Sequence, residues 1–203
     1  MNLIFRLMKP ISFVTSNTGK FLSFSKVLAQ FHLVAEQVCF KLPEPSLNSL
    51  EEIACTKVHF AYSMLKKPCV AIDGGFYLDS LHGFPATYAE FTTSKIGVEG
   101  YLRLIDGKER GCRFINALAY MDNKLAQPRY FSSSIEGTLA HQERGMLPPE
   151  AWSPLWTLFI PRGFKKTLAE MDQEERQDWR EKNYSHSTSS LFAQWFIQYS
   201  STA

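Results

Sequence analysis

The sequence of 203 residues has no cluster of like charge and no long apolar run. Its 22 basic and 20 acidic residues are spread along the chain and leave a net charge of +2, so no polybasic tract favours a nucleic acid polymer or an anionic membrane as a partner. No apolar stretch approaches the length of a transmembrane helix. We therefore expect small molecules as partners.

Cysteine is scarce, and its four copies form no CxxC pair. They lie at positions 39, 55, 69 and 112 inside apolar runs, which favours reduced, buried thiols over a disulfide framework or a zinc site. The apolar patch at residues 1–10 is interrupted by Arg6 and Lys9 and is too short for the core of a signal peptide. Together these features predict a cytoplasmic protein.

The chain does contain enough apolar residues, 45% of the total, for a substantial core. Their pattern predicts strands at 11–16, 68–73, 112–123 and 128–140, and helices at 20–31, 46–67, up to about 106, 167–182 and 190–199. No repeat, low-complexity segment or clear linker divides them, so we expect one domain over residues 1–203. Strands that alternate with helices indicate an α/β or mixed α+β architecture.

The stretch FVTSNTGK, residues 13–20, ends in Gly-Lys as a phosphate-binding loop does. It has no glycine at its front, and Phe21 stands where a magnesium-binding Ser or Thr would follow. Asn17 and Lys20 are expected between the end of a strand and the start of a helix, where free N–H groups and the helix dipole favour an anion. The plainer interpretation is a helix cap with a solvated lysine.

Three more charged residues suggest phosphate chemistry. Glu52 and Lys57 share one helix but lie about 140° apart around its axis, so they would flank a site. Asp73 is expected at the end of a strand, where Gly74 and Gly75 would let the backbone turn. Carboxylates can hold Mg²⁺ and activate water. Exposed helix charges and an ordinary turn are the alternative interpretations.

Five motifs, in this order, resemble the inosine triphosphate pyrophosphatase or Ham1-like family. The family's T-x-N-x-G-K is matched by Thr15, Asn17, Gly19 and Lys20, and its E-N-A-x-x-K by EIACTK at 52–57. IDGGFYLDSLHGFPATY at 72–88 follows D-D-S-G-L-x-V-D-A-L-x-G-x-P-G-x-Y, and TLAEM at 167–171 follows T-x-A-E-M. KNYSHS at 182–187 follows K-N-x-x-S-H-R but is one residue shorter. The resemblance spans nearly the whole chain.

This resemblance implies a long central mixed sheet flanked by helices, two lobes with a nucleotide cleft between them, and a homodimer. It also implies a Mg²⁺-dependent hydrolase that converts a nucleoside triphosphate to a monophosphate and pyrophosphate. The residues it assigns are Asp73, Lys20 and Lys57 in catalysis; Thr15, Asn17, Lys20, Lys57, Gly74, Trp152, Lys182, Ser185 and His186 in substrate binding; and Glu52 and Asp73 as metal ligands.

The departures from the family pattern fall mainly on its base-reading motifs. Ile72 replaces the first of the paired aspartates. PEAWSP at 149–154 takes the place of the family's G-F-G-Y-D-P loop, so that Glu150 replaces the Phe that stacks on the base and Ser153 replaces the Asp. Ser187 replaces the arginine of S-H-R. We expect retained phosphate handling and an altered base pocket, in which Glu150 either points inward or faces solvent.

Two functions of different class stay open from these residues. The first is an active pyrophosphatase, which is favoured by the retention of Asn17, Lys20, Glu52, Lys57 and Asp73. The second is a degenerate relative that binds a nucleotide or a protein without turnover, which the loss of the aspartate and the arginine favours. A related pyrophosphatase of the Maf type would open with S-x-S-P-R-R, which TSNTGK does not supply.

Overall fold

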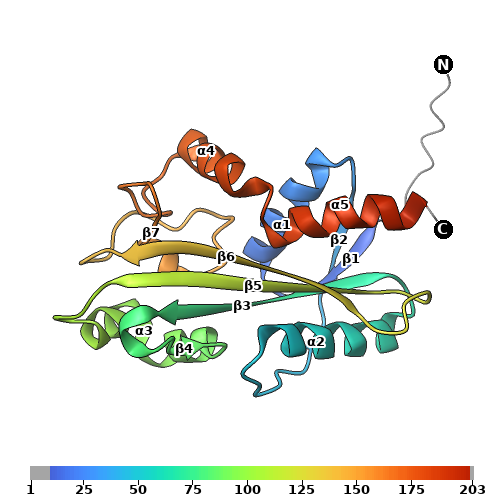
Figure 1. The fold of residues 1–203 in the computed structure, drawn as a ribbon, viewed down its shortest axis with the longest axis horizontal. Coiled ribbons are helices and arrows are strands. Elements are labelled where there is room, and N and C mark those ends of the chain that lie inside the picture. Colours follow the sequence, from blue (N-terminus) through green and yellow to red (C-terminus); the bar gives the residue numbers. More distant parts are fainter. Residues whose placement is uncertain (1–9, 202–203) are drawn as a thin grey trace.

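A computed structural model of the chain describes residues 10–201 as a mixed sheet of seven strands with five α-helices (Figure 1). The elements are β1 (Ile11–Val14), α1 (Thr18–Gln30), β2 (Ala35–Val38), α2 (Leu50–Leu65), β3 (Cys69–Leu78), β4 (Pro85–Ala86), α3 (Ala89–Leu104), β5 (Gly111–Met121), β6 (Arg129–Leu139), β7 (Phe159–Pro161), α4 (Gln173–Tyr184) and α5 (Thr188–Ser201), with 3₁₀ turns at Asp79–Leu81 and Pro154–Thr157. The expectation about a signal peptide concerns mainly residues 1–9, which lie outside the described residues.

The sheet has the strand order β2-β1-β3-β5-β6-β7, and β4 pairs with β3 beside this path. β1 is parallel to β2 and β3, whereas β3, β5, β6 and β7 pair antiparallel in succession. The three long strands β3, β5 and β6 run along most of the molecule in Figure 1. This confirms the long mixed sheet and the hairpin expected from residues 112–140.

Three apolar clusters divide the molecule into two lobes. At one end of the sheet, α1 and α5 cover one face around Phe24 and Phe192, and α2 covers the other face around Ala54 and Val58. At the other end, Phe76 joins α3 and the segments near α4 in a third cluster. The long strands belong to both lobes, as the expected fold class requires.

The helix starts are set by side-chain caps. Asn17 caps α1 and Ser49 caps α2, each by accepting a hydrogen bond from the backbone N–H three residues on. Asp172 and Glu175 form a reciprocal capping box at the start of α4. The helix expected from residue 167 therefore begins only at Gln173.

Strand β3 does not end at Asp73, where the sequence predicts its end, but continues to Leu78. Gly74 and Gly75 stay in the strand and pair with Asn116 and Ile115 of β5, so no sharp turn follows the aspartate. The glycines were read as turn residues because sequence alone does not reveal the pairing partner. The short strands β2, β4 and β7 were not anticipated either, since none has a clear apolar alternation.

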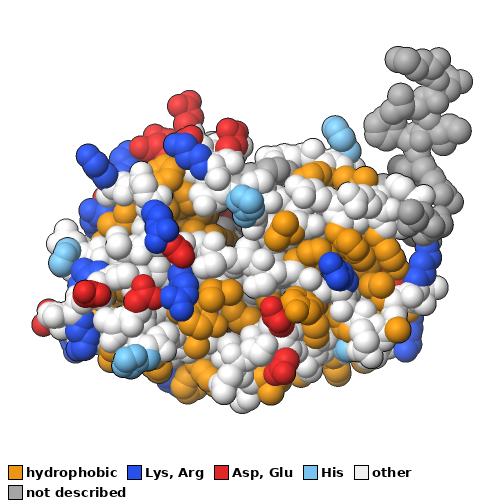
Figure 2. Space-filling view, in the orientation of Figure 1, with side chains coloured by type: hydrophobic (Ala, Val, Ile, Leu, Met, Phe, Trp, Pro, Cys, Tyr) orange, Lys and Arg blue, Asp and Glu red, His pale blue; other side chains and the backbone are white. Residues whose placement is uncertain are grey.

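The four cysteines are all free thiols, but only two match the expected burial. Cys69 and Cys112 are buried, whereas Cys55 is partly buried and Cys39 is exposed. Burial raises the pKa of the Cys69 thiol to about 12. Charged side chains of both signs are interspersed on the face shown in Figure 2. No helix within residues 10–201 is long and apolar enough to cross a membrane.

Candidate active site

The candidate site lies where one edge of β3 has no neighbouring strand. On that edge β1 pairs only with Cys69 and Val70, and β4 only with Phe76 and Tyr77. Within the described part of the chain, residues 71–75 therefore pair with β5 alone. The sheet has a gap at this point, and the turn after β1 leads into α1 beside it.

The turn after β1 is shaped by its own polar side chains. Thr15 Oγ1 accepts a hydrogen bond from the Asn17 backbone N–H (3.1 Å), and Asn17 Oδ1 accepts one from the Lys20 backbone N–H (2.9 Å). Asn17 Nδ2 donates to the Trp152 carbonyl (3.3 Å). Thr15 and Asn17 thus hold the positive end of α1 in place, while the Lys20 side chain reaches two neighbouring hollows.

Gly19 explains how the 148–153 loop reaches this turn. A Cβ atom at position 19 would run into the Ala151 carbonyl oxygen, so only glycine permits this close approach. The approach places the Trp152 ring beside α1, where it meets Phe114 and Trp156 edge to face at 4.6 and 5.4 Å between ring centroids. Trp152 consequently forms part of both hollows.

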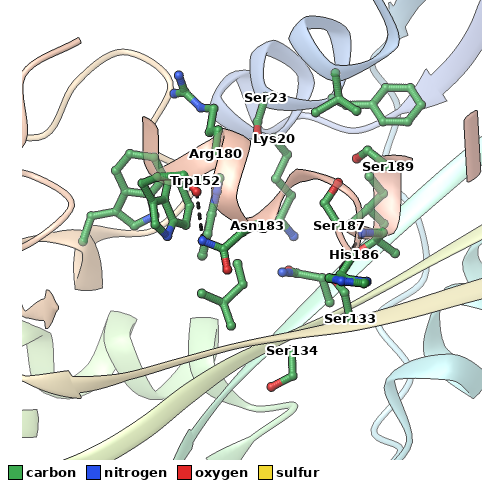
Figure 3. A pocket seen from close by; sticks show the side chains of 18 residues that line it. Lys20, Ser23, Ser133, Ser134, Trp152, Arg180, Asn183, His186, Ser187 and Ser189 are labelled. Carbon is green, nitrogen blue, oxygen red and sulfur yellow. Dashed lines mark hydrogen bonds between the residues drawn. The ribbon is translucent and has the colours of Figure 1, made fainter. Parts of the chain in front are cut away.

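The first hollow lies between α1, the sheet and the α4–α5 connection (Figure 3). Its lining residues are Lys20, Ser23, Phe24, Val27, Ile72, Asn116, Ser133, Ser134, Ile135, Trp152, Trp156, Trp179, Arg180, Asn183, His186, Ser187, Thr188 and Ser189. Figure 3 shows Lys20 extending from α1 into this hollow, between Asn183 and Ser187. Aromatic walls with a few polar groups suit a planar, polar ligand.

The second hollow extends from the gap in the sheet toward α3. Its lining residues are Asn17, Lys20, Gly74, Gly75, Ala89, Glu90, Thr93, Ser94, Phe114, Asn116, Trp152, Ser153 and Pro154. Lys20, Asn116 and Trp152 line both hollows, so the two hollows adjoin at these side chains. An elongated ligand could occupy both at once.

An ion-pair cluster around a buried lysine lies on the opposite face of β3. Lys57 Nζ is 2.7 Å from Glu44 Oε2 and 3.4 Å from Asp73 Oδ1, and the lysine side chain is only 8% exposed. Side chains alternate across a strand, so Ile72 and Gly74 face the hollows while Asp73 faces α2. Asp73 is nevertheless the direct neighbour of Gly74, which lines the second hollow at the gap.

Glu150 takes neither of the two positions expected for it. Its side chain is 10% exposed, and Oε1 lies 3.1 Å from Arg180, 3.3 Å from Arg176 and 3.6 Å from Lys26. Burial by itself raises the pKa of this carboxyl, but its own backbone amide and the three cations outweigh that effect, so the pKa is lowered. Glu150 therefore joins the 148–153 loop to α4 and α1.

Two buried indole groups of the first hollow have no hydrogen-bond partner within the described residues. They are Trp156 Nε1 and Trp179 Nε1, on residues that are 1% and 5% exposed. An indole N–H can only donate, and an unpaired buried donor is costly. Both N–H groups are buried within the wall of the first hollow and are not exposed to it, so they add no donor for a ligand there.

A sequence model described as the Ham1 family matches residues 11–190 of the chain. The chain belongs to the Ham1 family. One Ham1 relative, the dITP/XTP pyrophosphatase of Methanopyrus kandleri, is 33% identical over 189 residues, which cover 92% of this chain and 95% of that protein. The protein of the same name from Saccharolobus solfataricus is 32% identical over 177 residues, which cover 87% and 86%.

Solved Ham1 structures share the fold. The HAM1 protein from Coxiella burnetii superposes with a TM-score of 0.71 at 18% identity and covers 97% of this chain and 100% of its own. The Ham1 protein from Staphylococcus aureus gives 0.70 at 19% identity, with 94% and 98% covered.

The Ham1 motif E-N-A-x-x-K contributes two residues that lie in different surroundings. Lys57 is buried beside Asp73, whereas Glu52 is exposed on the first turn of α2, and no contact joins it to the Lys57 cluster. Glu44 occupies the place beside Lys57 instead. We did not anticipate Glu44 because LPEPS indicates only a break between elements, and its contact with Lys57 depends on tertiary structure.

Metal ligands at this site must come from a small set of carboxylates. Within residues 10–201 no group of three or more Asp, Glu, His or Cys side chains is arranged to hold a metal. Mg²⁺ in phosphate-transfer sites is usually held by one or two carboxylates together with water and substrate phosphates. Glu44 and Asp73, which share Lys57, fit that requirement.

The Ham1 motif K-N-x-x-S-H-R is only partly at the first hollow. His186 lines it, but Lys182 is directed toward Asp178 (2.8 Å) and the Phe164 ring (5.2 Å), and exposed Ser185 lines neither hollow. The structure thus brings together Lys20, Trp152 and His186 at the first hollow and Asn17, Lys20, Gly74 and Trp152 at the second.

Ser187 occupies the position of the motif's arginine, and it stabilises the start of a helix. Its Oγ accepts a hydrogen bond from the Ser190 backbone N–H (3.2 Å) and donates to Ser190 Oγ (2.8 Å), so it caps the first turn of α5. It also lines the first hollow. Arg180 of α4 also lines that hollow, and its guanidinium contacts Glu150.

Proposed function

We propose that this protein hydrolyses a nucleoside triphosphate to a nucleoside monophosphate and pyrophosphate. The observation that carries the proposal is the gap beside β3, where Lys20 and the start of α1 lie next to the strand that bears Asp73. The names of the relatives, dITP/XTP pyrophosphatases, support a non-canonical purine nucleotide as substrate. The protein is then a hydrolase of nucleotide metabolism.

The phosphates bind in the second hollow. Lys20 provides a positive charge there, and the N-terminus of α1 adds backbone N–H groups and the positive end of the helix dipole. Thr15 and Asn17 position that helix end rather than act as free ligands. The lining of the second hollow therefore suits an anionic group.

Asp73 accepts the proton of the water that attacks the α-phosphorus, and pyrophosphate leaves. Lys57 orients the Asp73 carboxylate through their ion pair. Glu44 and Asp73 would hold Mg²⁺, with Glu52 as the alternative ligand from the sequence motif. When bound, Mg²⁺ would neutralise phosphate charge.

The base occupies the first hollow, against the Trp152 ring. Glu150 cannot stack on it because that side chain is paired with Arg176 and Arg180. Ser187 is too short to replace a base-reading arginine. Base selection thus depends on a lining that differs from the family motif, which is the altered pocket expected from the sequence.

We further propose that the enzyme is a cytoplasmic homodimer, requires Mg²⁺, and acts on free nucleotides rather than on a nucleic acid polymer or at a membrane. These properties agree with the mixed surface charge and the free cysteines. They also follow from the resemblance of the five motifs to the family.

The test is a pyrophosphate-release screen over normal and modified nucleoside triphosphates with Mg²⁺. We expect release by the wild-type protein, its loss in Asp73→Asn, and no change in the matched surface control Asp106→Asn, because Asp106 is exposed and away from both hollows. Nucleotide binding without any release would support the non-catalytic alternative. Near-normal release by a folded Asp73→Asn protein would exclude Asp73 as the base.

A further inference from the structure

Asn116 has a position that neither the sequence motifs nor the comparisons assign to the site. It lies on β5 directly opposite Gly74 of β3 in the strand register. A Cβ atom at position 74 would lie 2.8 Å from Asn116 Oδ1 and 3.9 Å from its Cγ. The carboxamide of Asn116 therefore lies over the space that a side chain at 74 would fill.

This carboxamide has no hydrogen-bond partner among residues 10–201, although it is partly buried. Its neighbours on the same face of β5, Phe114 and Leu118, are core residues. A polar amide between two core side chains is costly unless its donors and acceptor are used. Other polar groups nearby, such as Asn17 and Ser187, already bond within the protein.

Asn116 is also one of the three side chains that line both hollows, with Lys20 and Trp152. Lys20 supplies charge and Trp152 an aromatic wall, whereas Asn116 supplies two N–H donors and one carbonyl acceptor. A ligand group that hydrogen-bonds to the Asn116 carboxamide where the two hollows adjoin needs both acceptor and donor oxygens. Sugar hydroxyls and phosphate oxygens have that chemistry.

We propose that Asn116 binds substrate at the sugar and α-phosphate, the segment that joins a base in the first hollow to the phosphates in the second. This proposal rests on the proposed nucleotide hydrolysis. The Asn116 amide donates to a phosphate or sugar oxygen, and its carbonyl accepts from a sugar hydroxyl. It makes no contact with the terminal pyrophosphate, which lies farther along the second hollow.

Gly74 gives the proposal a specific consequence. A methyl group at position 74 would displace the Asn116 carboxamide, because the nearest atom is the movable end of that side chain. Gly74→Ala and Asn116→Ala should then remove the same contact. Two changes that remove one interaction are not additive in a double-mutant cycle.

The experiment compares the wild-type protein, Asn116→Ala, Gly74→Ala and the double variant, with Asn123→Ala as the control at an exposed asparagine in the β5–β6 turn. Calorimetry measures the Kd of inosine monophosphate, adenosine monophosphate and pyrophosphate separately, and a pyrophosphate assay gives KM and kcat for the triphosphates. Thermal melts monitor folding. If Asn116→Ala does not fold, Asn116→Asp, which keeps the shape and adds a negative charge, replaces it.

We expect each single variant to weaken monophosphate binding about tenfold, which corresponds to about 1.4 kcal/mol. Pyrophosphate binding should stay unchanged, and the double variant should bind no more weakly than either single one. A folded Asn116→Ala protein that matches Asn123→Ala, additive losses, or an equal loss of pyrophosphate binding would overturn the proposal. A wild-type protein that binds no nucleotide and releases no pyrophosphate would overturn the proposed function and this inference together, whereas active wild type with a neutral Asn116→Ala would overturn the inference alone.

Discussion

Lys57 is a buried cation with two carboxylate partners that differ in exposure. Asp73 is 14% exposed and Glu44 is 73% exposed, and both contact the same Nζ atom. Burying a lysine is costly unless its charge is paired, so the two carboxylates and the lysine form one unit. The sequence motif points to Glu52 as the metal ligand, whereas the geometry points to Glu44.

These two assignments lead to opposite results for a pair of matched variants. We expect Glu44→Gln to lower kcat/KM about a hundredfold, a loss of about 2.7 kcal/mol of transition-state stabilisation. It should also raise the Mg²⁺ concentration for half-maximal rate, since an amide is a weaker ligand than a carboxylate. Glu52→Gln should leave both quantities nearly unchanged. Large effects of Glu52→Gln together with small effects of Glu44→Gln would instead assign Glu52 as the metal ligand.

Ser187 allows a second prediction for a single side chain. Because its Oγ caps α5, Ser187→Ala should lower the free energy of unfolding by about 1 kcal/mol. For a domain of this size that lowers the Tm by about 2–4 °C. Ser132→Ala, at an exposed serine of β6, is the control. Equal melting temperatures for the two variants would show that the cap contributes nothing measurable.

At the scale of elements, α4 is held by one carboxylate. Arg176 and Arg180 lie on this helix, and both contact Glu150, which also approaches Lys26 of α1. The side chain exposures of Glu150 and the two arginines are 10%, 12% and 17%, so the cluster is screened only weakly by water. The cluster fixes one wall of the first hollow.

Glu150→Gln should therefore destabilise the protein by about 3 kcal/mol at pH 7, because it leaves buried arginines without their counter-charge. The folded-state pKa of Glu150 lies below its ordinary value. Its stabilising contribution is thus present above the unfolded pKa, about 4.3, and is lost as the pH falls through the folded value. Urea unfolding of both proteins between pH 7 and pH 3 should show a difference that shrinks in acid. Exposed Glu143→Gln is the control, and a pH-independent difference would contradict the prediction.

The elements show which features a sequence can predict. The turn at Asn17 and the cores of α1 and α2 depend on local spacing and capping, and they were placed correctly. The continuation of β3 through Gly74 and Gly75 depends on pairing with β5, so local glycine preferences gave the wrong result. Glu150 was misplaced for the same kind of reason, since its partners come from other elements.

For the whole molecule, the fold class and the order of the helices and long strands followed from alternation and from the five motifs, whereas the short strands β2, β4 and β7 were missed. The division of the candidate site between the two faces of the sheet could not be predicted from the sequence. Adjacent residues such as Asp73 and Gly74 lie at the gap in strand pairing but face opposite sides of the sheet: Gly74 lines the second hollow, whereas Asp73 contacts Lys57 of α2. That gap arises because β1 pairs only with Cys69 and Val70 and the two-residue β4 pairs only with Phe76 and Tyr77, a property of the whole sheet.

The exposed surface of α3 predicts the state of assembly. Five large apolar side chains are exposed on α3 or just before it, namely Phe84, Tyr88, Phe91, Ile96 and Leu104. Apolar surface of this kind is usually covered by association, so we expect a mass of twice 23.2 kDa by light scattering at micromolar concentration.

The variant Phe91→Glu should shift this mass toward the monomer, because a charge would have to be buried when two copies associate through α3. Ile197→Glu is the matched control, since Ile197 is also an exposed apolar residue but lies on α5, at the other end of the sheet (Figure 1). A monomer mass for the wild-type protein would contradict the homodimer. A dimer that is disrupted by Ile197→Glu and not by Phe91→Glu would keep the homodimer but place its interface on α5, because the charge acts only where the surfaces meet.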